Sequence, residues 1–148
     1  MKAIGKYILI VAVLISFYSN GFAQVKGSSI RIKDLNPGEE VDSTTSKENK
    51  AKYFVNFKID DPSQADSVFF RFGTTKGGAE VLTETGTFKK DGNSYSVKTQ
   101  GPSYPVKNTE ISCRIKITKK QYRDAEFLSL VVKDKAGLYT NVLTMRLK

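Results

Sequence analysis

The chain has 148 residues, and its 24 lysines and arginines against 15 aspartates and glutamates give a formal net charge of +9. It has no histidine and one cysteine. The composition therefore lacks the usual general base and the commonest transition-metal ligand, and it argues against an internal disulfide and against a zinc or iron–sulfur site. A chain of this size predicts a single domain, and we expect neither enzyme activity nor a cofactor.

Residues 1–23 have the pattern of a bacterial secretory signal peptide, with two lysines near the start, an apolar run at 7–17, and small residues at Gly21 and Ala23 before the expected cut. The apolar run is shorter than the roughly 20 residues that span a membrane, so we expect cleavage rather than a retained anchor. The mature chain, 24–148, then carries +7, since two of the nine net positive charges leave with the peptide. We expect it in the periplasm or at the outer cell surface, with no membrane span.

Alternating apolar and polar residues predict short strands along the whole mature chain, and no helical period interrupts them. The predicted strands are residues 28–35, 53–59, 68–72, 81–89 in one or two pieces, 95–97, 111–117, 127–133 and 138–148. Between them we expect solvated loops at 39–50 and 73–78, a tight hairpin at Asp91-Gly92, an irregular crossing at 101–105 and a polar bend around Tyr122.

The strictest alternation places Ile111, Cys113, Ile115 and Ile117 on one face of a strand. Such a row is typical of a strand with one dry face and one wet face. We therefore interpret Cys113 as a small buried hydrophobe rather than a nucleophile. The alternative is an intermolecular disulfide, which would give a reducible dimer.

Short strands separated by turn residues are the sequence pattern of an all-β antiparallel sandwich. We predict an immunoglobulin-like β-sandwich of about seven strands for residues 24–148, preceded by the signal peptide. The absence of tryptophan and of a cysteine pair excludes an antibody-type domain.

Residues 131–141, VVKDKAGLYTN, resemble the last hairpin of bacterial immunoglobulin-like domains and of fibronectin type III-like domains, which often carry an Asp-x-Ala-Gly turn between two strands. Tyr122 stands where such folds often hold a corner tyrosine. The resemblance implies a binding or spacer role in the cell envelope or outside the cell, and it brings no catalytic residues to this chain.

Three acids, Asp60, Asp61 and Asp66, lie close together in the sequence. Paired carboxylates can hydrolyse a glycosidic bond, and several converging oxygens can bind calcium. The spacing here lacks the glycine and the regular ligand positions of a dedicated calcium loop. We therefore favour a solvated turn over either site.

A basic ridge is predicted on and after the strand at 111–117. Its residues are Arg114, Lys116, Lys119, Lys120 and Arg123. A row of cations would bind an anionic polymer in a salt-dependent way. The alternative is an ordinary solvated strand face whose cations prevent edge-to-edge pairing.

Four tyrosines, Tyr95, Tyr104, Tyr122 and Tyr139, could stack on sugar rings, although tyrosines in a β protein are more often half-buried strand residues. We expect no nucleic-acid partner, because the chain has no recognition module.

The sequence thus favours a non-enzymatic secreted or periplasmic bacterial protein that acts by contact with another envelope or surface protein, as an accessory subunit of an assembly. Its strand edges and the loops at 39–50 and 73–78 are the expected contact surfaces. The alternative is a carbohydrate-binding or adhesion module that recognises anionic polysaccharide. Neither the partner nor the oligomeric state follows from these patterns.

Overall fold

The computed structural model describes residues 27–37 and 50–147. The predicted signal peptide and most of the loop predicted at 39–50 therefore lie outside the described residues. The described strands are β1 (Ile32–Pro37), β2 (Lys50–Ile59), β3 (Ala65–Gly73), β4 (Leu82–Asp91), β5 (Ser94–Lys98), β6 (Ser103–Lys107), β7 (Glu110–Thr118), β8 (Phe127–Asp134) and β9 (Leu143–Arg146). A 3-10 turn, η1 (Pro62–Gln64), and one short helix, α2 (Lys119–Asp124), complete the described elements.

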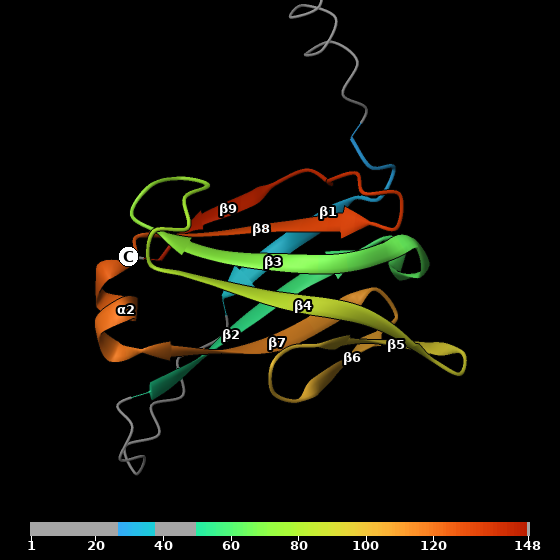
Figure 1. Ribbon diagram of the computed structural model, residues 1–148, viewed down its shortest axis with the longest axis horizontal. Coiled ribbons are helices and arrows are strands. Elements are labelled where there is room, and N and C mark those ends of the chain that lie inside the picture. Colours follow the sequence, from blue (N-terminus) through green and yellow to red (C-terminus); the bar gives the residue numbers. More distant parts are fainter. Residues whose placement is uncertain (1–26, 38–49, 148) are drawn as a thin grey trace, which may run out of the picture.

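The strands pair antiparallel throughout, in the continuous order β1-β2-β7-β6-β5-β4-β3-β8-β9. The predicted all-β antiparallel class is therefore confirmed. The described residues form nine strands where the sequence predicted about seven, and one nearly closed sheet links them instead of two separately paired sheets. Figure 1 shows this sheet curling round, with α2 at one end and the β4–β5 hairpin at the other.

The two edge strands of the sheet, β1 and β9, approach each other. Asn141, just before β9, forms hydrogen bonds to β1. Its Oδ1 accepts a hydrogen bond from the amide of Ile32 at 3.1 Å, and its Nδ2 donates to the carbonyl of Ile32 at 2.9 Å. One side chain thus takes the place of a neighbouring strand at β1. The amide of Ser28 also donates to the carbonyl of Tyr139 at 2.9 Å. These contacts tie the beginning of the described chain to its last hairpin.

The core lies between the facing halves of the curved sheet. The rings of Phe57 on β2 and Phe70 on β3 meet edge to face with centroids 6.1 Å apart, and Tyr53 meets Phe72 in the same way at 5.9 Å. The inward positions predicted from alternation are buried on β2, β3, β7 and β8. Cys113 is fully buried among them, as predicted, and burial raises the pKa of its thiol to about 12, which keeps it protonated and unreactive at neutral pH.

Two predictions of irregular structure were wrong. The segment predicted as an irregular crossing at 101–105 runs into β6, and the predicted polar bend is the helix α2. Thr118 is the N-cap of α2 and exchanges hydrogen bonds with Gln121 in a capping box. Tyr122 on this helix is half-buried and packs against Tyr53, with ring centroids 5.7 Å apart.

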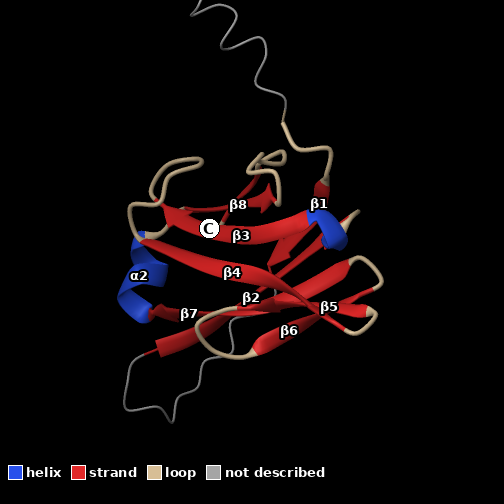
Figure 2. Ribbon diagram, turned by 45° about the vertical axis from the view of Figure 1, so that its right-hand side comes forward, coloured by secondary structure: helices blue, strands red, loops and turns tan. Residues whose placement is uncertain are grey.

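The ends of the described chain also differ from prediction. The first strand begins at Ile32 rather than at Ser28, and the last is confined to β9 instead of running from Leu138. Figure 2 shows that strands make up most of the described chain, with loops and α2 at the ends of the strands. Within the described residues, no helix is long and apolar enough to cross a membrane.

Candidate functional site

One side of β7 lacks a neighbouring strand over most of its length. On its other side β7 pairs with β2 from end to end. On this side β6 pairs with it only at Ile111 and Glu110, and no other strand in the described part of the chain replaces β6 further along. We refer to residues 112–118 of this strand as the open edge of β7. A strand edge of this kind presents backbone groups that another chain can pair with.

Pro105 explains why the pairing stops. Residues two apart on a strand direct their backbone groups to the same side. Since Lys107 pairs with Glu110 across the short turn, Pro105 also faces β7. Proline has no amide hydrogen to donate to a neighbouring strand. The ladder between β6 and β7 therefore ends one step from the hairpin, and β6 continues along β5 instead.

Two hydrogen bonds show which backbone groups of β7 face the open side. The carbonyl of Thr109, just before the strand, accepts from the amide of Ile59 and so faces β2. The carbonyl of Arg114 accepts from the hydroxyl of Tyr104 at 3.1 Å and so faces away from β2. By the alternation of a strand, the backbone of Lys116 also faces the open side.

A groove of about 590 Å³ runs along this edge between β7 and β4. Leu82 and Glu84 line it from β4, and Ile117 lines it from β7. The loop before β6 and the side chains of Tyr104 and Gln121 complete its walls. The groove therefore combines apolar surface with one carboxylate and several hydrogen-bonding groups.

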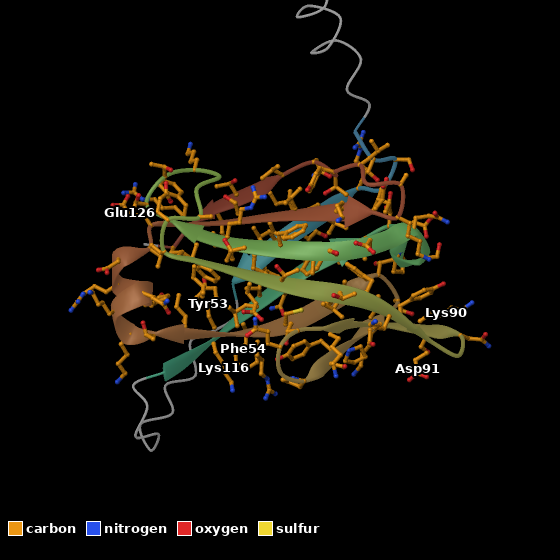
Figure 3. All side chains as sticks on the ribbon, in the orientation of Figure 1. Tyr53, Phe54, Lys90, Asp91, Lys116 and Glu126 are labelled. Atoms are coloured by element: carbon orange, nitrogen blue, oxygen red, sulfur yellow. The ribbon has the colours of Figure 1, made fainter. Side chains whose placement is uncertain are left out.

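The structure places the predicted basic ridge along β7 and α2. Arg114 and Lys116 are exposed on the outer face of β7 and also line the groove, and the guanidinium of Arg114 lies 5.1 Å from the ring centroid of Phe54. Figure 3 shows Lys116 directed outward, on the same side as Phe54. The other three cations, Lys119, Lys120 and Arg123, are exposed on α2.

The cations of α2 are not equivalent to those of β7. Arg123 lies 3.8 Å from the carboxylate of Asp124, and both Lys119 and Arg123 take part in further interactions. The geometry therefore brings Arg114 and Lys116 together at the groove, with the remaining cations of the ridge beyond its end. Anion binding by the ridge stays a prediction.

A second hollow of about 770 Å³ is lined by residues of β1, β2, β6 and β7, and Pro102, Tyr104 and Arg114 border both hollows. At its far end Lys58 lies 3.1 Å from Asp34 and 3.5 Å from Glu110. The hydrogen bond to Asp34 is the main reason that the pKa of Lys58 is raised. With one ammonium and two carboxylates, this cluster has a net charge of −1, so it adds no positive charge for an anionic ligand.

The four tyrosines do not form one stacking surface. Tyr104 is buried, which raises its pKa, and Tyr122 packs against Tyr53. Tyr139 lies beside Phe69, with ring centroids 6.3 Å apart. Tyr104, Tyr122 and Tyr139 therefore contact different parts of the core and surface.

The three acids each have a local role. Asp60 accepts from the amide of Arg31 at 2.9 Å, and Asp61 caps η1 through Ser63. Asp66 bonds to Ser67 and lies 3.7 Å from the ammonium of Lys133. The interpretation of a turn fits Asp60 and Asp61, whereas Asp66 lies in β3. Within the described residues, no group of three or more acidic, histidine or cysteine side chains is arranged to hold a metal ion.

Sequence reasoning missed two features of the surface. It gave no role to Pro105, although a proline at alternate spacing from the hairpin is a signal for an interrupted ladder. It also placed Leu138 and Val142 in a strand, whereas both lie before β9 and are exposed, as is Tyr139.

No family model, curated protein or solved structure matches this chain.

Proposed function

We propose that this chain is a non-enzymatic protein of the bacterial periplasm or outer surface that acts by contact with another protein, as an accessory subunit of an envelope or surface assembly. The observation that carries the proposal is the open edge of β7 beside a groove. Strand edges are regular sites of protein recognition, because main-chain hydrogen bonds give affinity and alternate side chains give specificity.

The groove adds to this argument. An unused edge is commonly protected by charged side chains, a bulge or a covering loop. Arg114 and Lys116 are such charges, but here they flank an accessible groove that combines apolar surface with a carboxylate and hydrogen-bonding groups. The resemblance to immunoglobulin-like and fibronectin type III-like domains fits a binding role and stays part of the proposal.

Recognition of anionic polysaccharide is the weaker candidate. It would need cations in one row or exposed rings in one plane. The cations divide between β7 and α2, and Tyr104 and Tyr122 are engaged in packing. A protein partner makes better use of an edge that offers backbone groups.

The test is site-specific photocrosslinking in cells of the source bacterium, with the photoreactive residue at position 116 or at position 90. Both positions hold exposed lysines, and Lys90 lies in the β4–β5 hairpin at the far end of the molecule (Figure 3). We expect position 116 to yield one dominant protein adduct and position 90 to yield none. Adducts of equal intensity at both positions, or capture of polysaccharide alone, would contradict the proposal.

A further inference from the structure

The open edge of β7 has features that specify what can occupy it. Two backbone groups along this edge already form hydrogen bonds to side chains instead of to a neighbouring strand. The hydroxyl of Tyr104 donates to the carbonyl of Arg114 at 3.1 Å, and the side chain of Gln121 accepts from the amide of Thr118 at 3.0 Å. Both backbone groups of Lys116 lie between these two contacts, and the amide of Arg114 lies just before the first of them. By alternation all three groups face the same side. A single extended segment could pair with all three.

The side chains of such a segment would alternate between two environments. Residues directly opposite Arg114 and Lys116 would share their outer face, where cross-strand pairs of opposite charge are favourable. The residues between them would point into the groove, toward Leu82 and Glu84 of β4. Threonine suits that inner position, because it has a methyl group for Leu82 and a hydroxyl for the carboxylate of Glu84.

A second copy of this chain is a poor occupant. Pairing β7 with β7 of another copy would bring Arg114 and Lys116 of one molecule beside those of the other on the same face. Like charges directly opposite each other destabilise a strand pair. The net charge of +7 expected for the mature chain opposes self-association in general and favours an acidic partner.

We propose that the open edge of β7 takes an extended acidic segment of another protein as an added strand, with acids opposite Arg114 and Lys116 and small β-branched residues directed into the groove. This inference rests on the proposed function, because it names the chemistry of the partner at the same edge. It differs from binding by charge alone, since the backbone of the partner must pair with β7.

The test uses a fluorescent nine-residue peptide of alternating threonine and glutamate. Two further versions carry N-methyl groups on one or the other alternate set of residues. In a strand, successive amides face opposite edges, so one alternate set of amides faces β7 and the other set faces away from it. One methylated version should therefore lose affinity for the purified protein about tenfold or more, since each lost hydrogen bond contributes about a kcal/mol. The other version should bind like the parent peptide.

Charge is tested separately with two double variants. Arg114→Glu with Lys116→Glu reverses two charges at the edge, and Lys89→Glu with Lys90→Glu makes the same change in total charge elsewhere on the surface. We expect the first variant to lose binding and the second to keep it. Binding of the parent peptide should also slow hydrogen exchange at the amide of Lys116.

The possible outcomes distinguish failure of the added-strand inference from failure of the proposed function. Equal binding of both methylated peptides, or equal losses in both double variants, would show attraction by charge alone and would overturn the strand inference. A protein adduct at position 116 without peptide binding would overturn this inference and leave the proposed function standing. Alternation-specific peptide binding without any cellular adduct would support the strand inference and count against the proposed function. Self-association through the edge in sedimentation would also overturn the inference.

Discussion

At the scale of single residues, Asp134 shows how one carboxylate can organise a hairpin. Its Oδ1 accepts from the amides of Ala136 at 2.9 Å and Leu138 at 2.8 Å, across the turn that follows β8. Gly137 in this turn has φ of 84°, a conformation that favours glycine. The Asp-x-Ala-Gly pattern noted in the sequence is therefore a requirement of the turn.

Hydrogen bonds to its carboxylate lower the pKa of Asp134. The hydrogen bond from Ser28 is the largest cause and that from Leu138 is the next, while burial acts in the opposite direction. Because the folded-state pKa lies below the ordinary value of 3.8, ionised Asp134 stabilises the fold above that value. This stabilisation is lost as the pH falls from the ordinary value through the lowered one.

We therefore expect Asp134→Asn to lower the Tm by a few degrees at pH 7, with the difference from the parent protein closing below about pH 4. Thermal unfolding followed by circular dichroism across this range measures it. Asp91→Asn, at an exposed site in the β4–β5 hairpin, is the control and should follow the parent protein at every pH. A Tm difference for Asp134→Asn that stays constant into acid would contradict the role given to the carboxylate.

At the scale of elements, the sequence predicted strands better than it predicted their ends. Rows such as Val68, Phe70 and Phe72 are buried as expected, because alternation reports directly which side chains face the core. α2 was missed because six residues are too short to show a helical period. The capping box between Thr118 and Gln121 was the available signal.

β6 was missed for a different reason. Two prolines near its start indicated an irregular segment, yet a proline is tolerated where its missing amide faces no partner. Pro105 faces the open side of β7 and leaves the pairing of β6 with β5 intact. Pro105 can therefore signal the open edge only once the hairpin between β6 and β7 is recognised.

The junction of β1 with the last hairpin gives a prediction at this scale. Asn141→Ala removes both hydrogen bonds to Ile32 and leaves a buried amide and carbonyl without them. We expect a loss of roughly 1–3 kcal/mol in the free energy of unfolding. Urea denaturation measures the loss, and hydrogen exchange should accelerate at the amide of Ile32.

Thr144→Ala, an exposed position on the neighbouring β9, serves as the comparison, since its hydroxyl contacts Ser129 and not β1. We expect a smaller loss in this variant and no change in exchange at Ile32. Unchanged stability and exchange in Asn141→Ala would show that the two edges are held together by other contacts.

At the scale of the whole molecule, the class of fold could be predicted and its closure could not. Alternation gives the face of each strand but not the order of strands in the sheet. The contact between Asn141 and Ile32 joins residues 109 positions apart, and no local pattern marks it. The candidate site likewise depends on the order of the strands in the sheet. Arg114 and Lys116 were selected as cations from the sequence, and only the arrangement of β6, β4 and β7 makes them the border of a groove.

The proposed contact surface depends most directly on β7 being open. Residue-resolved amide hydrogen exchange of the free protein tests this, because neighbouring residues on one strand serve as each other's controls. We expect the amides of Arg114 and Lys116 to exchange much faster than those of Ile115 and Ile117, which face β2. Equal protection of all four amides would show that the edge is already covered in the free protein, and would contradict both the groove as a contact surface and the added strand.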